Sequence, residues 1–287
     1  MKKHLLFLLI IMFYGCTESN LAFHPRLNPS SGTLELVQTF GGSKNDVAKS
    51  VVSTVDGGFA VLGYTQSLDG DITDKATEDY DFWMLKFNSE AQLEWNKTYG
   101  GSGDDRGSSI IETSDGGYAL LGYSDSSDGD VSSNNGNRDF WLVKINDSGV
   151  VTWEKSFGYG GVDEGVSIIE TSDNHLILSG VLDVTASGGE GNQGRFTTKH
   201  AGGDYWSIKI STTGDIVWSR FYGGSFTDSP AGISETLIGG FINVGGSDSN
   251  DVDISNNKGS YDFWIVKSDV NGDIVWEKSF GGSEIDE

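Results

Sequence analysis

The chain is a series of short apolar segments separated by turns rich in glycine, aspartate and asparagine. One representative stretch contains four such segments, at Ser109–Glu112, Tyr118–Tyr123, Phe140–Ile145 and Val150–Phe157. The first pair is separated by Asp115-Gly116-Gly117 and the last pair by Asn146-Asp147-Ser148-Gly149. Both sequences favour tight turns, because glycine accepts positive φ and Asn and Asp side chains bond to nearby backbone. Short, evenly spaced strands without a helical period predict an all-β fold.

The four-strand pattern recurs about every 58 residues. An aromatic-Gly-Gly sequence opens each repeat, at Phe40-Gly41-Gly42, Tyr99-Gly100-Gly101, Phe157-Gly158-Tyr159-Gly160-Gly161, Tyr222-Gly223-Gly224 and Phe280-Gly281-Gly282. Asp-aromatic-Trp follows in each, at Asp81-Phe82-Trp83, Asp139-Phe140-Trp141, Asp204-Tyr205-Trp206 and Asp262-Phe263-Trp264, and then a second tryptophan, at Trp95, Trp153, Trp218 and Trp276. We therefore expect a repeat domain over residues 33–287 with four units, at about 44–101, 102–160, 161–224 and 225–282.

A β-sandwich and a β-propeller both fit this pattern, and two features favour the propeller. Identical four-stranded units need a neighbour on each face, and radial repetition supplies one while leaving little exposed edge. Successive apolar residues such as Trp141-Leu142-Val143 indicate burial on both faces of the sheet. We predict four-stranded antiparallel blades. The two tryptophans of a unit should pack between blades and pair across the hairpin of the third and fourth strands; a stacking platform for sugars is the alternative.

The repeat contains Gly-Gly-Ser-x-x-Asp, Asp-Gly-Gly-aromatic, Ser-x-Asp-Gly-Asp and Asp-aromatic-Trp-x-x-Lys in this order. This pattern resembles the β-propeller repeats of secreted proteins and surface lipoproteins from Bacteroidota-type bacteria. The resemblance covers residues 33–287 and implies a propeller of the cell envelope or the extracellular space. It implies no particular activity.

Residues 1–15 have the pattern of a bacterial signal peptide. Lys2 and Lys3 precede the apolar run Leu5–Phe13, which is too short to cross a bilayer. The sequence Phe13-Tyr14-Gly15-Cys16 resembles a lipobox, with the chain's only cysteine, Cys16, as the site of lipid attachment; Phe13 and Tyr14 depart from the usual residues. Residues 16–32 then form a polar tether. We expect an outer-membrane lipoprotein that faces the periplasm or the cell surface.

The two ends of the repeat domain do not match each other. Thr33–Phe40 resembles a fourth strand without the preceding three, and residues 281–287 resemble the start of a fifth unit. Propellers commonly close by pairing an N-terminal strand with the last blade, but the fourth unit already has its own fourth strand. These features suggest a piece of a larger ring. The alternative is a four-bladed ring with a spare strand at its edge.

Charge restricts the partners. The net charge of −23 disfavours binding to nucleic acid and leaves hard cations as plausible charged ligands. In an up-and-down sheet the long loops gather at one end, and that end should be acidic. Its alternating Asp and Gly residues suit calcium, although none forms an EF-hand. The candidate calcium ligands are Asp69, Asp71, Asp128, Asp130, Asp251 and Asp253; the alternative is that they are turn residues in solvated loops.

The third unit breaks the repeat. Its long loop gains seven residues and contains Arg195, Lys199 and His200, which are candidate ligand contacts on an acidic surface, or merely part of a tolerated insertion. His175, in the opposite turn, should lie at the other end of the sheet. No nucleophile, phosphate-binding or zinc motif occurs, so we predict no catalytic site. The chain is expected to be a non-catalytic binding module with a protein or glycan partner; the alternatives are a polysaccharide-acting envelope enzyme and a structural spacer in a longer surface protein.

Overall fold

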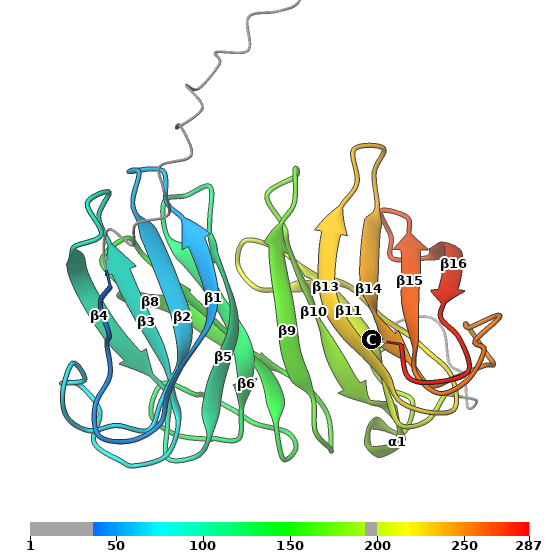
Figure 1. The fold of residues 1–287 in the computed structure, drawn as a ribbon, viewed down its shortest axis with the longest axis horizontal. Coiled ribbons are helices and arrows are strands. Elements are labelled where there is room, and N and C mark those ends of the chain that lie inside the picture. Colours follow the sequence, from blue (N-terminus) through cyan, green and yellow to red (C-terminus); the bar gives the residue numbers. More distant parts are fainter. Residues whose placement is uncertain (1–36, 193–199, 287) are drawn as a thin grey trace, which may run out of the picture. The chain divides into compact units, whose positions relative to one another are not determined.

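Each repeat forms one four-stranded antiparallel sheet in the computed structural model (Figure 1), which describes residues 37–192 and 200–286. The chain divides into residues 1–39 and 40–287, and the four sheets belong to the second part. The order of strands within every sheet is the order along the chain, because each strand pairs with the next through a short turn. The predicted all-β fold with four repeated sheets is confirmed.

The described residues form sixteen strands. The first sheet contains β1 (Asp46–Ser53), β2 (Phe59–Thr65), β3 (Asp81–Phe87) and β4 (Leu93–Tyr99). The second contains β5 (Asp105–Glu112), β6 (Tyr118–Ser124), β7 (Asp139–Ile145) and β8 (Val151–Phe157). The third contains β9 (Glu164–Glu170), β10 (Leu176–Asp183), β11 (Gly203–Ile210) and β12 (Ile216–Tyr222). The fourth contains β13 (Asp228–Glu235), β14 (Phe241–Ser247), β15 (Asp262–Ser268) and β16 (Ile274–Phe280).

The first strand of the second sheet is longer than its sequence indicates. β5 begins at Asp105, four residues before the expected start at Ser109, and its pairing with β6 shifts register between Gly107 and Ser109. A β-bulge inserts one extra residue and increases the local twist. The bulge interrupts the alternation of apolar and polar residues, which is why the pattern alone places the strand too late.

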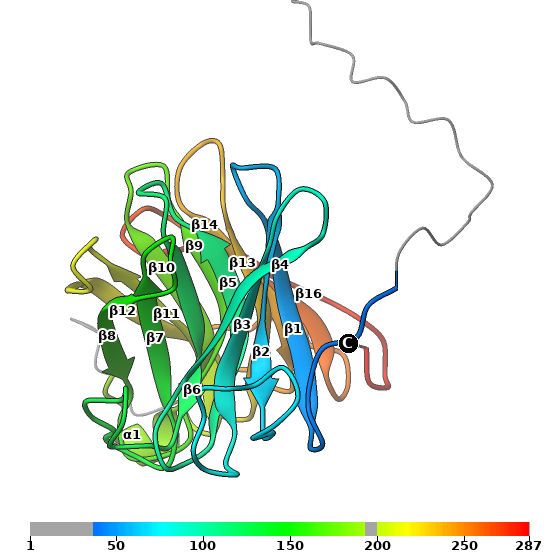
Figure 2. The same cartoon turned by 90° about the vertical axis from the view of Figure 1, so that its left-hand side faces the viewer.

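The sheets stand side by side in chain order, as Figures 1 and 2 show for residues 40–287. β1 contacts β5, β5 contacts β9, and β9 contacts β13. Every residue of β3 and of β7 is buried, as the uninterrupted apolar runs predict. The largest apolar clusters lie between consecutive sheets; one of them joins Phe82 and Met84 of β3 to Trp141 and Val143 of β7. The core of this fold is therefore a set of inter-sheet layers.

The first tryptophan of the second, third and fourth units packs against the preceding unit, as the predicted packing between blades requires. Its partner is the aromatic residue of the preceding Asp-aromatic-Trp sequence, and the ring centroids are 4.7 Å apart for Phe82–Trp141, 4.9 Å for Phe140–Trp206 and 4.8 Å for Tyr205–Trp264. The expected pairing of the two tryptophans across one hairpin is wrong. Trp141 pairs with Ser156 and Trp153 pairs with Lys144, so the two rings lie on opposite faces of the sheet and contact different neighbours.

The third unit contains the one helical turn in the described residues, α1 (Val184–Ser187), at the start of its long loop. Asp183 caps it by accepting a bond from Ala186 N, and Gly188 ends it in the left-handed conformation. Residues 37–40 are not in a strand; the rest of the expected strand at Thr33–Phe40 lies outside the described residues, as do the signal peptide, Cys16 and the whole tether. No helix in residues 37–192 and 200–286 has the length and apolar character needed to span a membrane.

Candidate functional site

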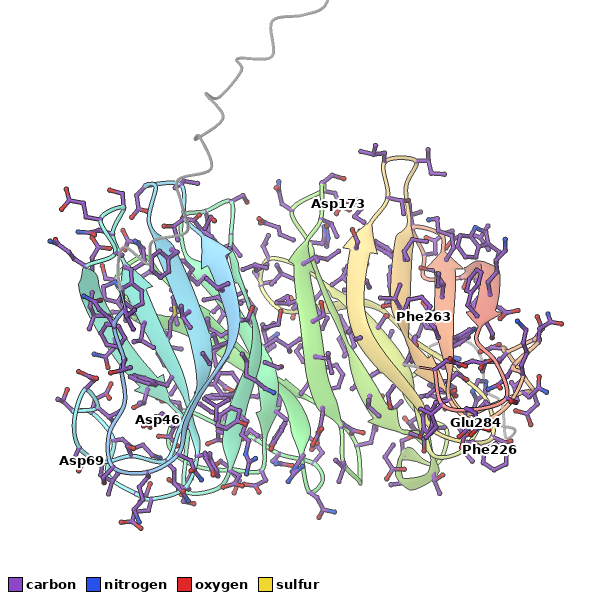
Figure 3. All side chains as sticks on the ribbon, viewed as in Figure 1. Asp46, Asp69, Asp173, Phe226, Phe263 and Glu284 are labelled. Atoms are coloured by element: carbon purple, nitrogen blue, oxygen red, sulfur yellow. The ribbon has the colours of Figure 1, made fainter. Side chains whose placement is uncertain are left out.

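The long loops and the short turns lie at opposite ends of the sheets, as the topology predicts. Figure 3 labels Asp46 and Asp69 at one end and Asp173, in the β9–β10 turn, at the other. His175 belongs to the same turn as Asp173, whereas His200 lies in the loop between β10 and β11. We call the end with Asp46 and Asp69 the loop end, and the other the hairpin end.

The candidate calcium ligands bond to the backbone that precedes the first strand of their own sheet. In the first unit, Asp69 Oδ1 accepts from Ser43 N at 2.7 Å and Asp71 Oδ2 accepts from Gly41 N at 2.9 Å. The same bonds occur in two further units: Asp128 with Ser102 N (2.7 Å), Asp130 with Gly100 N (3.2 Å), Asp251 with Ser225 N (2.9 Å) and Asp253 with Gly223 N (3.4 Å). The Asp-x-Asp loop therefore holds the aromatic-Gly-Gly-Ser segment that precedes the first strand of its sheet.

These bonds limit what the loops can offer a metal. Each bond between an aspartate and the Gly-Gly-Ser backbone uses one carboxylate oxygen, so any calcium ion would take the second oxygen and carbonyl groups. Within the described ranges, no cluster of three or more His, Cys, Asp or Glu side chains is arranged to hold a metal ion. Asp69, Asp71 and their counterparts thus have a structural role, which is to hold the Gly-Gly-Ser backbone.

A second set of aspartates, from Gly-Gly-Ser-x-x-Asp, lies deeper at the loop end. Asp105 is buried, and its Oδ2 accepts from Gly101 N at 2.7 Å and from Ser126 Oγ at 2.9 Å. Burial raises the pKa of Asp105 to about 6 against the bonds from Ser124, Gly101 and Ser126. Asp163 and Asp228 are also buried, and burial likewise raises the pKa of each to about 6. The sequence predicts that this end is acidic, but these three aspartates are buried within it.

The aspartate before each aromatic-Trp is buried at the junction with the following unit. A Cβ built on Gly100 would lie 2.6 Å from Asp81 Oδ1 and 2.7 Å from Asp105 Oδ2, and on Gly158 it would lie 2.2 Å from Asp139 Oδ1. Only glycine, which has no Cβ, leaves room for these carboxylates. Asp139 Oδ1 is buried and has no hydrogen-bond partner. This close approach explains the first glycine of the aromatic-Gly-Gly sequence.

The four junction aspartates have different partners. Lys75, whose side chain is fully buried, places Nζ 2.7 Å from Asp79 and 2.9 Å from Asp81. His200 Nδ1 lies 2.6 Å from Asp204 Oδ2. In the second and fourth units the same carboxyl accepts a backbone N–H, from Asn135 to Asp139 and from Lys258 to Asp262. The partner lies six positions before the aspartate in the first unit and four positions before it in the other three, and it bonds through its side chain only in the first and third units.

The third-unit candidates fall into two groups. Arg195 and Lys199 lie outside the described residues. His200 is buried against Phe221, with ring centroids 4.8 Å apart, and its Nε2 lies 3.7 Å from Asp253. Burial disfavours the imidazolium, but the hydrogen bond and the charge of Asp204 outweigh it and raise the pKa of His200. His200 therefore joins the third unit to the fourth at the loop end.

An exposed aromatic residue lies beside this irregular loop, and sequence reasoning missed it. Phe226 occupies the position that is Lys44 in the first unit and Gly103 in the second, and 59% of its surface is exposed. Its N–H bonds to Ser249 Oγ at 3.0 Å, and the third-unit loop reaches the same segment through Ala201 N and Gly224 O, 3.0 Å apart. Figure 3 labels Phe226 at the loop end. In the sequence, Phe226 could have been recognised because it differs from the residues at the same position of the other units.

The hairpin end contains grooves with repeated ion pairs. One groove, of about 510 Å³, is lined by Asp56, Lys86, Glu94, Trp95 and Glu112, among others. Lys86 Nζ lies 2.7 Å from Asp56 and 2.8 Å from Glu94, and its hydrogen bond to Asp56 holds the pKa of that carboxyl below its usual range. A carboxylate with a lowered pKa is a poor general acid or base near neutral pH. Asp56 is therefore not suited to proton transfer in this groove.

Comparisons of this chain with protein-family models and with curated protein sequences returned no match. The arrangement of its own residues is therefore the basis for the function proposed next.

Proposed function

We propose that the four sheets are blades of a β-propeller and that the chain is a non-catalytic interaction module of the bacterial cell envelope. The shared contacts between consecutive sheets support the propeller, since each unit uses one face to meet the unit before it and the other to meet the unit after it. A lipid on Cys16 would hold the module at the outer membrane, with residues 16–32 as the tether.

The observation that carries the binding role is the exposed ring of Phe226 next to the third-unit loop. Repeated polar residues at the loop end are used in bonds within the fold, so they offer little to a ligand. A binding site in a repeat protein needs residues that differ from the repeat, and Phe226 is one of them. An exposed aromatic ring within an acidic surface suits a sugar face or a cationic peptide side chain.

The test is a glycan and peptide array probed with the soluble chain from residue 17, as wild type and as Phe226→Ser. We expect binding to a protein or glycan partner that is reduced at least tenfold in Phe226→Ser. The matched control is Leu237→Ser, which removes a fully exposed apolar residue in the turn between β13 and β14 and should bind like the wild type. Absence of any binding would refute the proposed role, and equal binding by Phe226→Ser would refute the proposed site.

The proposed anchor has a separate test. Cys16 is the only cysteine, so a clickable fatty acid supplied to a bacterial host should label the full chain and should not label Cys16→Ser. Labelling of both proteins, or of neither, would contradict the lipoprotein assignment.

A further inference from the structure

The outer face of the fourth sheet is apolar and exposed. We define this outer face as Phe263, Ile265, Trp276 and Phe280, which share one side of the sheet because Phe263 pairs with Phe280 and Lys267 pairs with Trp276. Phe263, Trp276 and Phe280 are 39%, 42% and 51% exposed, whereas the residues equivalent to Phe263 in the other sheets (Phe82, Phe140 and Tyr205) are completely buried. Figure 3 labels Phe263 on β15.

The equivalent face of every other sheet is an interface. Besides the aromatic pairs described above, the second tryptophan of each of the first three units lies under the turn glycine of the next. A Cβ added to that glycine would lie 3.0–3.2 Å from the indole ring in the pairs Trp95–Gly149, Trp153–Gly214 and Trp218–Gly272. Trp276 occupies the same position on the outer face as these three tryptophans.

A third contact at the hairpin end also recurs. The turn after the first strand donates a backbone N–H to a glutamate at the end of the next unit's first strand: Val55 N to Glu112 (2.9 Å), Ser114 N to Glu170 (2.8 Å) and Ser172 N to Glu235 (2.8 Å). The equivalent residue in the fourth unit is Leu237, which is fully exposed.

The loop end of the fourth unit already has the start of another junction. Asp286 N donates to Tyr261 O at 2.7 Å, which repeats the bonds from Asp105 N to Tyr80 O (2.6 Å) and from Asp163 N to Arg138 O (2.8 Å). Asp286 is also bonded to Gly282 N, as Asp105 is to Gly101 N. Residues 281–286 therefore adopt the arrangement of the first residues of a following unit.

From these four repeated features we infer that the outer face of the fourth sheet binds a further four-stranded unit of this same repeat type, one that is not among residues 1–287. Its tryptophan would pack on Phe263, its turn glycine would lie over Trp276, and a glutamate at the end of its first strand would accept from Leu237 N. The inference goes beyond the proposed function and does not depend on any ligand at Phe226.

The first sheet of a second copy does not match this face. It has Trp83, but Ser53 occupies the position of Glu112, Glu170 and Glu235, so no carboxylate would meet the turn at Leu237. Ala91 occupies the position of the turn glycine, with φ of 58°, and its methyl group would lie where the indole of Trp276 must approach. The occupant must therefore have the glutamate and glycine that the second, third and fourth units have.

The experiment uses cysteine accessibility, because the chain from residue 17 has no cysteine of its own. Lys278→Cys places a thiol on β16, at a position that is exposed in the present chain. We would extend this variant after Asp286 with a second copy of residues 106–157, which supplies Glu112, Trp141 and Gly149. Maleimide labelling of the thiol should slow at least tenfold relative to the unextended chain, whereas a Ser89→Cys variant on the first sheet should label at the same rate in both.

Two further extended variants test whether the protection depends on the repeated contacts. An extension with residues 229–280 of the fourth unit should protect Lys278→Cys equally, and the first extension with Trp141→Ala and Glu112→Ser in the added copy only should protect it much less. Failure of both intact extensions to slow labelling would overturn the inference. So would a concentration-dependent dimer of the unextended chain that protects the thiol and is abolished by Phe263→Glu, because that result assigns the face to a second copy.

Discussion

Phe82 of the first sheet packs edge-on against Trp141 of the second, with ring centroids 4.7 Å apart and an angle of 64° between the ring planes. Both side chains are fully buried. The same contact recurs at the next two junctions. Burial of the tryptophan of the Asp-aromatic-Trp sequence therefore stabilises the interface with the preceding unit. Stability in such an array is approximately the sum of unit terms and nearest-neighbour interface terms.

The first prediction compares two phenylalanines at the same position of the repeat. Phe82→Ala should lower the free energy of unfolding by about 3–5 kcal/mol, since it removes a fully buried ring and leaves a cavity. Phe263→Ala, on the exposed outer face, should lower it by less than about 1 kcal/mol. Urea unfolding of the two variants measures the difference, and equal losses would contradict the interface role of Phe82.

The second prediction concerns the close approach at Gly100. Gly100→Ala should lower the free energy of unfolding by about 1–3 kcal/mol, because the new methyl group would overlap the carboxylates of Asp81 and Asp105. Gly232→Ala is the control: the nearest atom to its Cβ position, on Val244, is 4.0 Å away, so the change should be neutral or stabilise by a few tenths of a kcal/mol. Thermal melts that rank the two variants in the reverse order would refute this account of the aromatic-Gly-Gly sequence.

Much of the architecture could be predicted from sequence because the repeat supplies four independent copies of each turn and strand. The glycine and asparagine turns locate the hairpins, and the apolar runs indicate burial on both faces. The pairing register within a hairpin was harder to predict from the sequence. A bulge between Lys144 and Ile145 on one side and Val151 and Trp153 on the other shifts the pairing, and counting residues across the turn does not reveal it.

The loop end was harder to predict than the strands. Asp105 and Asp139 are polar residues in glycine-rich segments, so their sequence context indicates a solvated loop. They are buried because they lie where consecutive units meet, and this burial depends on packing between sheets. His200 illustrates the same limit. It was selected as a cation on an acidic surface, whereas the fold places its ring against Asp204 and Phe221.

The third prediction tests the loop aspartates. Asp128→Ala should lower the free energy of unfolding by about 1–2 kcal/mol, because Ser102 N loses its acceptor at 2.7 Å. Asp128→Asn keeps an acceptor oxygen and should lower the free energy of unfolding by less than half as much as Asp128→Ala. Melting curves with added calcium and with chelator show whether the loop also holds an ion: calcium ligation requires a chelator-sensitive melting temperature in the wild type that Asp128→Asn diminishes.

The last prediction is a stability maximum on the weakly acidic side of neutrality. Burial raises the pKa of Asp105, Asp163 and Asp228 to about 6 in the folded chain, from 3.8 for the free side chain. The folded state therefore binds more protons than the unfolded state between about pH 4 and 6. The contribution of these three carboxyl groups to the free energy of unfolding is complete below about pH 4 and is lost as the pH rises through 6. The loss is on the order of 1–3 kcal/mol for each group.

Aspartates with lowered pKa values act in the opposite direction, and at lower pH. The pKa of Asp115 and of Asp173 is held at about 2 by hydrogen bonds that outweigh burial, so their contribution is present above about pH 4 and is lost as the pH falls toward 2. Guanidinium unfolding at intervals from pH 3 to 8 should give its highest free energy between about pH 4 and 5. Asp105→Asn should flatten the decline toward neutral pH, because the amide does not titrate. A free energy of unfolding that rises from pH 5 to pH 7 would show that these carboxyl groups are ionised in the folded chain.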